Sequence, residues 1–455
     1  MFKVSELIEA VKGKPAGKWD NTFIRGISID SRSIKKGEAF IAIKGDNFDG
    51  HDFIRQAARK GAACIVKERG INPGYKSKGV NIIEAGDTIK ALADIARFWR
   101  RRFNIPVIAV TGSNGKTTTK DMAAAVLSDR FKVLKNEGTR NNHIGVPMTL
   151  LKLNSGYDMA VLELGTNHPG EIGYLSDICE PNAGIITNIG PSHLKYLRDL
   201  KGVSREKRAI IEALQHPRVA ILNADDRFLR SELSKKRSKG LAIGFGMDRR
   251  SDFTASRARV FNGRTEFLVN KKYKFTLNTP GYYNIYNALA ATAAGRIFGI
   301  GYADIISRLN RFDFPKGRLR IVESGGVRFI DDSYNSNPLS LKQALRALSG
   351  FKAAGRKIFV MGDMLELGFG EKEFHREAGL QASACCDVFI TVGRLSKLSA
   401  RAAESVSRID SGNIFTCESV PEARRVLSED VSLKKGDLVL IKGSRLMKME
   451  EIINP

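Results

Sequence analysis

The stretch from residue 107 to residue 119 has the residue types and the spacing that binding a phosphate group requires. An apolar run ends at a loop bracketed by Gly112 and Gly115, and Lys116 and Thr117 follow directly. The two glycines allow a tight turn that directs backbone N–H groups at an anion, while the lysine supplies a positive charge. The threonine hydroxyl can bind a divalent metal ion beside the phosphates. These residues therefore predict a nucleotide-binding loop.

This loop is shorter than the general phosphate-loop pattern. The general pattern has a glycine five residues before the second loop glycine, whereas this chain has Val110 there and only Ser113 and Asn114 between its glycines. An ordinary strand–turn–helix corner with a chance lysine is the alternative. The order of apolar strand, loop and helix favours the phosphate loop, because the motif occurs in that context. We expect Thr118 to begin a helix over residues 118–128, whose positive N-terminal end faces the phosphates.

Two polar side chains stand at or after the carboxyl ends of later apolar runs. Residues 159–162 precede Glu163, and residues 184–188 precede the segment that contains His193. Ligands of open parallel sheets bind at the carboxyl ends of the strands, so we expect both side chains near the phosphate loop. A carboxylate there suits a hard cation that bridges phosphates. A capping or ion-paired Glu163 and an ordinary loop histidine at 193 are the alternatives.

The alternation of apolar runs and helical stretches predicts an α/β protein of three domains. The chain has 455 residues, which exceeds the size of one hydrophobic core. Residues 1–104 predict a small N-terminal α/β domain, and residues 105–313 predict a central domain that carries the phosphate loop on a parallel sheet. Proline and glycine near residue 315 break the pattern. Residues 314–455 then predict a second doubly wound, Rossmann-like domain.

The composition is that of a globular protein with a strongly basic balance. Hydrophobic residues make up 42% and charged residues 27%, and the net charge is +25. Lysine and arginine are spread over the whole length without interleaved aromatic residues, so polyanionic substrates explain the charge better than nucleic acid. No apolar stretch has the length of a signal-peptide core or of a membrane span, which predicts a cytoplasmic protein. The five cysteines lack metal-ligand spacing and predict reduced thiols.

Three further stretches are rich in polar residues: residues 141–147, residues 330–338 and residues 361–368, the last followed by His375. In this order, and together with the short phosphate loop, they resemble the Mur ligases, the ATP-dependent amide-forming enzymes of peptidoglycan precursor synthesis. The resemblance covers essentially the whole chain. It implies a UDP-substrate domain, a central ATPase domain and a C-terminal ligase domain that closes over the site. It also implies ATP and Mg²⁺ as cofactors, and UDP-N-acetylmuramoyl-tripeptide and D-alanyl-D-alanine as small-molecule substrates of a monomer.

The resemblance also implies roles for residues of this chain, taken motif by motif. It implies catalytic roles for Lys116, Lys207, His193 and Arg318, and a metal site of Thr117, Glu163, His193 and Lys207. It implies nucleotide binding by Gly112, Ser113, Asn114, Gly115, Lys116, Thr117, Thr118, Asn284, Asn287, Arg318, Asp332, Tyr334, Asn335 and Asn337. It implies substrate binding by Ser31, Arg32, Asp49, His51, Asn141 and Asn142. On composition alone, the polar clusters at 30–32 and 46–51 would be turns. Tyr283 stands where the family usually has histidine.

Lys207 is predicted to be carbamylated and to take part in the metal site. Residues 202–211 align with the segment in which most Mur ligases carry a modified lysine, although Arg208 and Ala209 replace the usual Gly-Glu. A carbamate turns a cationic amine into an anionic oxygen ligand, which suits a magnesium ion beside phosphates. The alternative is a solvated, charged helix face, and Lys201 is the second candidate for the modification.

Other functions share parts of this pattern. A sibling Mur ligase that adds the third amino acid, or folylpolyglutamate synthase, would have the same phosphate loop. A basic nucleic-acid-binding ATPase would instead turn over ATP in response to DNA or RNA, with a steep salt dependence of binding. Release of ADP that requires both the UDP-muramoyl-tripeptide and D-alanyl-D-alanine separates these alternatives.

Overall fold

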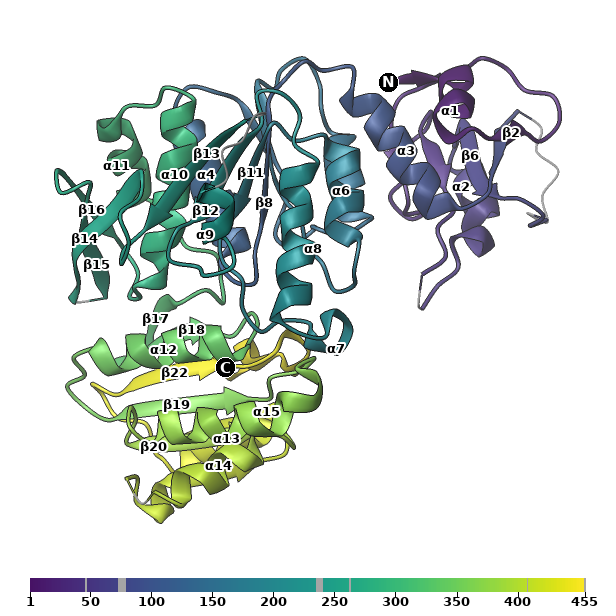
Figure 1. The fold of residues 1–455 in the computed structure, drawn as a ribbon. Coiled ribbons are helices and arrows are strands. Elements are labelled where there is room, and N and C mark those ends of the chain that lie inside the picture. Colours follow the sequence, from purple (N-terminus) through teal and green to yellow (C-terminus); the bar gives the residue numbers. More distant parts are fainter. Residues whose placement is uncertain (46, 73–78, 235–239, 262, 407, 454–455) are drawn as a thin grey trace. The chain divides into compact units, whose positions relative to one another are not determined.

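The computed structural model describes residues 1–45, 47–72, 79–234, 240–261, 263–406 and 408–453 (Figure 1). Residue 46 of the polar cluster 46–51 therefore lies outside the described residues. The chain forms two compact units. The first holds Met1–Ala109, Lys132–Thr166 and Glu171–Asn182, and the second holds Val110–Phe131, Asn167–Gly170 and Ala183–Pro455.

The N-terminal part of the first unit is a small α/β fold. Four of its strands are parallel, namely β4 (Ile27–Ser28), β5 (Ala39–Ile41), β6 (Cys64–Glu68) and β7 (Asn81–Ala85), and the short β2 (Lys14–Pro15) joins β7 antiparallel. The strands β1 (Phe2–Lys3) and β3 (Phe23–Ile24) form a separate pair. The helices are α1 (Val4–Val11), α2 (Ile54–Arg59) and α3 (Thr88–Arg100). Phe40, Ile54 and Ile65 are buried in the core that α2 shares with the sheet.

The remainder of the first unit carries Glu163. Strand β10 (Met159–Glu163) pairs parallel with β9 (Val133–Lys135), and Glu163 is its last residue. All five residues of β10 are buried, as expected for a strand covered on both faces. Helices α5 (Gly145–Leu150) and α6 (Glu171–Cys179) complete this part.

The second unit holds the phosphate loop on a sheet that contains the predicted parallel strands and is extended by antiparallel ones. Strand β8 (Val107–Thr111) ends in this unit, and β11 (Ala183–Ile186), β12 (Val219–Asn223) and β13 (Leu241–Gly246) are parallel neighbours. Strands β14 (Phe253–Phe261), β15 (Arg264–Val269) and β16 (Tyr273–Leu277) then add two antiparallel pairs. From Ser256 on, the residues of β14 alternate between partly buried and exposed, whereas the parallel strand β12 is buried continuously. An antiparallel sheet can have one face in contact with solvent, which explains why these strands extend the sheet in antiparallel pairs. The helices are α4 (Lys116–Leu127), α7 (Leu194–Leu197), α8 (Leu200–Glu212), α9 (Arg230–Ser234), α10 (Tyr283–Ile297) and α11 (Tyr302–Asn310).

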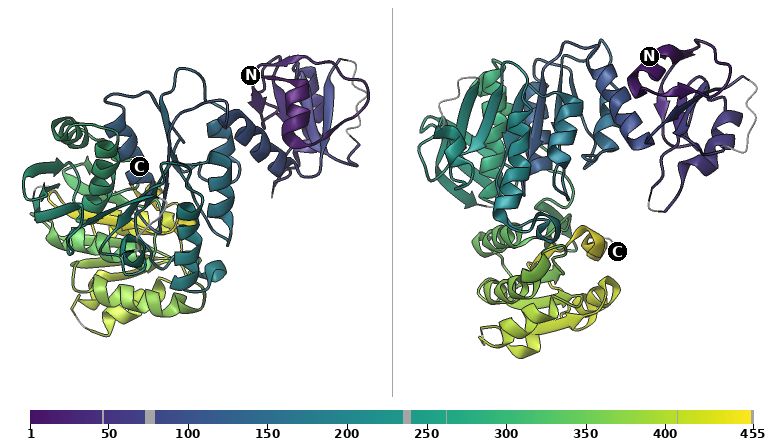
Figure 2. Two further views of the ribbon diagram at one scale, coloured as in Figure 1. Left: turned by 45° about the horizontal axis from the view of Figure 1, so that its top comes forward. Right: turned by 45° about the vertical axis from the view of Figure 1, so that its right-hand side comes forward.

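The C-terminal part of the second unit is a doubly wound sheet. Its strand order is β17-β18-β22-β19-β20-β21; β17 is antiparallel to β18, and the other neighbouring pairs are parallel. The strands are β17 (Arg320–Ser324), β18 (Val327–Asp332), β19 (Lys357–Gly362), β20 (Val388–Val392), β21 (Ile414–Cys417) and β22 (Leu438–Lys442). The helices are α12 (Pro338–Gly350), α13 (Glu371–Ala382), α14 (Lys397–Glu404) and α15 (Val420–Glu429), and Figure 2 shows helices on both faces of the sheet.

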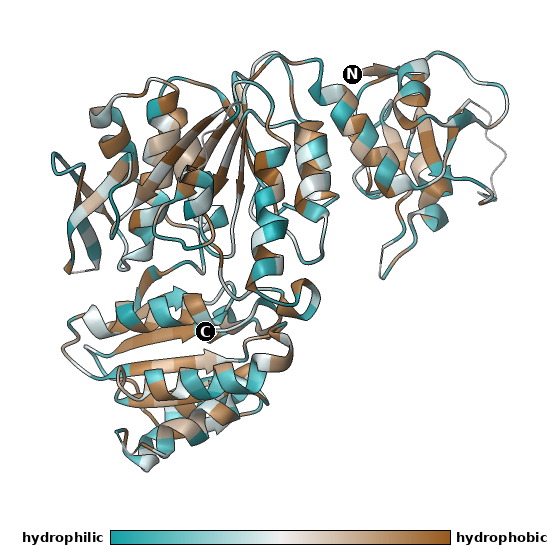
Figure 3. Ribbon diagram, in the orientation of Figure 1, coloured by the Kyte–Doolittle hydropathy of each residue, from teal (hydrophilic) through white to brown (hydrophobic). Residues whose placement is uncertain are grey.

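Two hydrophobic cores, one on each face, explain why this sheet is stable. Phe359 and Met361 of β19 belong to the core shared with α12 and α13, whereas Ile358 and Val360 belong to the core shared with α15. Successive side chains of a strand point to opposite faces, so a strand covered on both faces reads as a continuous apolar run. Figure 3 shows the same pattern as hydrophobic strands and helices that are polar on one side. Among the described residues, no helix has the length and apolar character needed to cross a membrane.

Candidate active site

The phosphate loop joins β8 to α4, and its two glycines adopt backbone conformations that other residues avoid. Gly112 has φ of +146° and Gly115 has φ of +80°. A Cβ atom at Gly112 would lie 1.9 Å from Thr187 Oγ1, and one at Gly115 would lie 2.4 Å from Asn287 Oδ1. Both positions thus require glycine for conformation and for space. Helix α4 begins at Lys116, two residues before the predicted start, so its N-terminal N–H groups are directed into the loop.

Asn188 holds the loop in shape. Its backbone carbonyl accepts from Ser113 N (2.9 Å), its side-chain oxygen accepts from Asn114 N (3.1 Å), and its side-chain nitrogen donates to the Asn114 carbonyl (3.0 Å). The run 184–188 extends two residues past the strand, because β11 ends at Ile186. The position of Asn188 among polar residues just after a strand is the sequence signal that could have identified its contact with the phosphate loop.

The segment that carries His193 also contacts the loop. Ser113 Oγ donates to the Gly190 carbonyl (2.8 Å) and accepts from Gly190 N (2.9 Å), and Ser192 Oγ donates to Ser113 Oγ (3.1 Å). His193 has φ of +52° and directly precedes α7. Burial lowers the pKa of His193, and the nearby Lys116 and Lys207 charges lower that pKa further.

Two lysines therefore lie within electrostatic range of His193. Lys116 is folded back onto the loop, where Nζ donates to the Gly112 carbonyl (2.9 Å). Lys207 on α8 is only 1% exposed, whereas Lys201 on the same helix is exposed. Burial, followed by the charge of Lys116, lowers the pKa of Lys207 well below its usual value. The helix face around Lys207 is thus not a solvated charge run.

In the first unit, Glu163 presents one unused carboxylate oxygen. Asn141 Nδ2 donates to Glu163 Oε1 (2.6 Å), and the Asn136 side chain bonds both backbone groups of Glu163 (2.9 Å each). Glu163 is 1% exposed, and its Oε2 has no hydrogen-bond partner among the described residues. A buried anionic oxygen without a partner is costly unless a cation binds it. The Asn142 side-chain oxygen instead accepts from Gly145 N (2.9 Å) just before α5.

The start of α10 supplies the predicted asparagines. Asn287 Oδ1 accepts from Thr119 Oγ1 of α4 (3.1 Å), and Asn287 Nδ2 donates to Asn284 Oδ1 (2.9 Å). Both asparagines are nearly fully buried, at 1% exposure for Asn284 and 3% for Asn287, so the chain of bonds fixes α10 against the phosphate-loop helix. Burial raises the pKa of Tyr283 well above its usual value, so its phenol stays neutral.

The C-terminal part of the second unit gathers the predicted residues that lie just before β17 and at or after the end of β18. The Arg318 guanidinium lies 4.0 Å from the centre of the Tyr334 ring, which is a cation–π contact. Lys442 Nζ donates to Asp332 Oδ2 (2.6 Å) and to the Asn335 carbonyl (3.0 Å). Lys442 and Asp332 are 110 positions apart, so spacing in the sequence gave no signal for this buried ion pair.

Asn337 connects this part to the phosphate loop. Its side-chain oxygen accepts from Ser340 N (2.9 Å) and so caps α12. Its Nδ2 donates to Asn114 Oδ1 (2.7 Å), and Asn114 Nδ2 donates back to Asn337 Oδ1 (3.2 Å). A second connection joins His193 Nδ1 to Glu366 Oε2 (2.8 Å). The structure thus brings together predicted residues from both parts of the unit.

The predicted substrate residues of the N-terminal fold differ in how far their side chains are bonded within the fold or exposed to solvent. Asp49 Oδ1 bonds His51 N (3.0 Å) and His51 Nδ1 (2.6 Å), while His51 Nε2 accepts from Glu68 N (3.0 Å). Both ring nitrogens are therefore used within the fold. Ser31 Oγ donates to Gln56 (2.6 Å), whereas the Arg32 side chain is 83% exposed and pairs with Asp30. The Arg32 guanidinium lowers the pKa of Asp30 to about 2.

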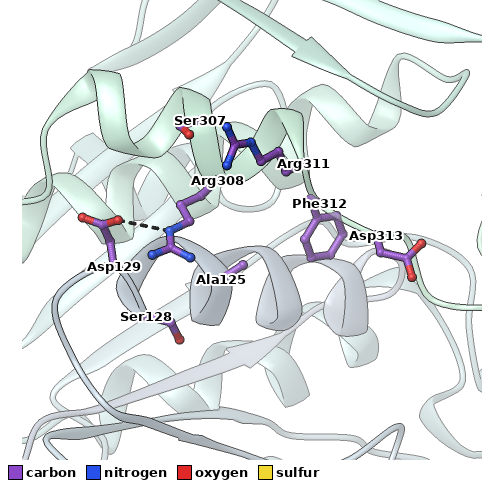
Figure 4. A pocket seen from close by; sticks show the side chains of 8 residues that line it. All are labelled: Ala125, Ser128, Asp129, Ser307, Arg308, Arg311, Phe312 and Asp313. Atoms are coloured by element: carbon purple, nitrogen blue, oxygen red, sulfur yellow. Dashed lines mark hydrogen bonds and ion pairs between the residues drawn. The ribbon is translucent and has the colours of Figure 1, made fainter.

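A cavity of about 460 Å³ lies at the opposite end of α4 from the phosphate loop (Figure 4). It is lined by Ala125, Ser128, Asp129, Ser307, Arg308, Arg311, Phe312 and Asp313. Arg308 Nε donates to Asp129 Oδ1 (3.1 Å) across it. None of the predicted site residues lines this cavity, so it is separate from the predicted nucleotide site.

A glycine-bracketed loop between a parallel strand and a helix places this chain among the nucleotide-binding α/β proteins. Three family models match it: the Mur ligase family catalytic domain over residues 23–100, the Mur ligase middle domain over 110–295, and the Mur ligase glutamate ligase domain over 317–445. The UDP-N-acetylmuramoyl-tripeptide–D-alanyl-D-alanine ligase of Bacillus subtilis is 35% identical, over 99% of this chain and 97% of its own. The chain belongs to the Mur ligase family.

Further relatives and solved structures of the same family are similar to this chain over nearly its whole length. The enzyme of the same name from Haemophilus influenzae is 34% identical over 100% of this chain and 98% of its own. A crystal structure of MurF from Acinetobacter baumannii superposes with a TM-score of 0.90 at 30% identity, covering 99% of this chain and 98% of that one. MurF from Thermotoga maritima in complex with ADP superposes with a TM-score of 0.83 at 28% identity, covering 96% and 97%. The predicted family resemblance and three-domain α/β fold are confirmed, while the exact domain boundaries stay predictions.

Proposed function

We propose that this protein is an ATP-dependent ligase that joins D-alanyl-D-alanine to UDP-N-acetylmuramoyl-tripeptide in peptidoglycan precursor synthesis. The observation that carries this proposal is the similarity over the whole chain to relatives named for that reaction. The phosphate loop and the residues gathered around it support it independently, because they suit transfer of a phosphoryl group. A cytoplasmic location and a monomeric state stay predictions.

The chemistry follows from the poor reactivity of a carboxylate. The γ-phosphoryl group of ATP passes to the terminal carboxylate of the tripeptide, which gives ADP and an acyl phosphate. The amine of D-alanyl-D-alanine then attacks the acyl carbon, so that the C–N bond forms while the C–O bond to phosphate breaks. Phosphate leaves and the amine loses a proton. Positioning and charge stabilisation dominate the catalysis of such a transfer.

This chain's residues supply those two needs. The N–H groups at the start of α4 and the Lys116 ammonium would hold the phosphates, with Asn284, Asn287 and Arg318 completing the nucleotide contacts. In the structure Lys116 bonds a carbonyl of its own loop, a neutral partner that a phosphate can replace. Charged hydrogen bonds to phosphate are stronger than those to a carbonyl.

Each unit, taken by itself, offers a donor that suits a magnesium ion. Glu163 has an unpartnered, buried carboxylate oxygen, and Thr117 offers a hydroxyl at the start of α4. Within the described ranges no three His, Cys, Asp or Glu side chains cluster, so phosphate oxygens and a carbamate on Lys207 would have to complete the ligand set. When bound, the ion neutralises charge on the transferring phosphoryl group.

The direct test is release of ADP by the purified protein. We expect turnover only when UDP-N-acetylmuramoyl-tripeptide and D-alanyl-D-alanine are both present. Turnover with UDP-N-acetylmuramoyl-dipeptide and a single amino acid would identify a sibling ligase, and turnover with folates would identify folylpolyglutamate synthase. Stimulation by DNA or RNA in place of the peptides would contradict the proposal.

Arg318→Ala should lower turnover roughly a hundred-fold while changing the affinity for the UDP-substrate less than about two-fold. The reason is that Arg318 lies in the C-terminal part and would contact ATP phosphates rather than the UDP-substrate. Steady-state kinetics and titration with the UDP-substrate measure the two effects. Lys316→Ala, which removes an exposed cation two positions away, is the control and should behave as wild type. A large loss of affinity at unchanged turnover would place Arg318 in the other binding site.

A further inference from the structure

The loop that follows β19 is firmly anchored in the C-terminal part. Met364 and Leu367 are buried at 0% and 2% exposure. Met364 N donates to His375 Nε2 (3.0 Å), and Leu365 N donates to Ser444 Oγ (2.8 Å). The loop therefore has fixed apolar and polar contacts on both sides of residue 366.

Glu366, between these anchors, is held in an unusual backbone conformation. Its φ is +63°, in the left-handed region that residues other than glycine rarely adopt. Residues kept in such conformations by the surrounding structure cluster at functional sites. The side chain is 44% exposed, and the carboxylate lies 2.8 Å from His193 Nδ1. The loop thus presents a carboxylate at the segment that contacts the phosphate loop.

The next residues of this loop pack against α7, the short helix that follows His193. A Cβ atom at Gly368 would lie 3.3 Å from the backbone nitrogen of Lys195, so the two segments are in close contact. Phe369 beside it is fully exposed. The position of Glu366 is therefore supported by backbone packing, in addition to its own contact with His193.

An anion at this place does not suit the substrates that the phosphate loop binds. The other charged groups that act on His193 are Lys116 and Lys207, both of which favour phosphate. A carboxylate repels ATP and the carboxylate of the tripeptide, so its second oxygen favours a cationic ligand over these anions. The second substrate brings one, because a dipeptide carries an ammonium group that must approach the acyl phosphate.

We infer that Glu366 binds the amino group of D-alanyl-D-alanine. The inference rests on the proposed function. The carboxylate accepts a hydrogen bond from the incoming amine and holds its nitrogen toward the phosphate loop, where the acyl phosphate forms. Glu366 is thus a substrate-binding residue of the second half-reaction and plays no part in the first.

The test is steady-state kinetics of Glu366→Gln, which keeps the shape of the side chain and removes its charge. The KM for D-alanyl-D-alanine should rise roughly tenfold or more, since a charged hydrogen bond is lost. The KM values for ATP and the UDP-substrate should change less than about two-fold, and the thermal midpoint should be unchanged because the side chain is exposed. Glu373→Gln, an exposed carboxylate of the same part, is the matched control. An unchanged KM for the dipeptide overturns the inference.

A second nucleophile separates amine binding from a role in positioning His193 or in joining the two parts of the unit. Hydroxylamine is uncharged at neutral pH and attacks an acyl phosphate directly, releasing phosphate and leaving a hydroxamate. Glu366→Gln should form hydroxamate from ATP and the UDP-tripeptide at the wild-type rate. Loss of hydroxamate formation in parallel with ligation would assign the carboxylate to the first half-reaction and overturn the inference. Failure of the wild-type protein to ligate would instead contradict the proposed function.

Discussion

Lys116→Ala should leave a folded protein with almost no ligase activity. The lysine lies at the start of α4, and its Nζ donates a hydrogen bond to the Gly112 carbonyl of the phosphate loop (2.9 Å). Its charge also acts on His193 and Lys207. A phosphate bound there would take this ammonium as its nearest cation. Removing such a group costs about 3 kcal/mol or more of transition-state stabilisation, which is a fall in turnover of at least roughly a hundred-fold.

The stability of this variant should be close to that of the wild type. Lys116 is partly exposed, and the carbonyl that it leaves can bond water, so the free energy of unfolding should change by less than about 1 kcal/mol. Lys116→Met keeps the aliphatic stem without the charge and should lose activity to the same extent. ADP release and thermal unfolding measure the two quantities. Near-normal turnover in either variant would remove the phosphate-loop assignment.

The parts of the site that follow strands directly could be predicted from the sequence. The loop after β8 and Glu163 at the end of β10 adjoin continuous apolar runs, and such runs mark buried strands. Asp332 ends β18, a strand that is mostly buried. Because ligands gather at the carboxyl ends of parallel strands, a strand prediction is at the same time a site prediction.

The groups that depend on tertiary contacts could not be predicted in this way. Glu366 is one carboxylate in a loop, and only its φ of +63° and its contact with His193 distinguish it. Lys442 ends a strand as Glu163 does, yet its partner Asp332 becomes visible only once β18 and β22 pair. The antiparallel strands β14 to β16 were missed because their half-exposed alternation is a weaker signal than an unbroken apolar run.

For Lys207, the structure decides between a buried lysine that could be modified and a lysine on a solvated, charged helix face. The cluster of charges around it favoured an exposed helix face, but Lys207 is only 1% exposed. Burial and the Lys116 charge lower its pKa, so the neutral amine is favoured. A neutral amine is the form that adds carbon dioxide, which gives a carbamate and a proton.

Lys207→Ala should therefore lower ligase activity roughly a hundred-fold, because it removes the anionic oxygens that the carbamate would supply. Added acetate should restore part of the activity, since a small carboxylate can enter the space that the side chain leaves. Lys201→Ala, an exposed lysine of the same helix and the second candidate for the modification, is the control and should keep full activity without acetate. In wild-type protein supplied with ¹³C-labelled bicarbonate, a carbamate carbon resonance should appear that Lys207→Ala lacks. Wild-type activity in Lys207→Ala, or loss of activity that acetate leaves unchanged together with no carbamate resonance in the wild type, would show that the buried amine serves the fold alone.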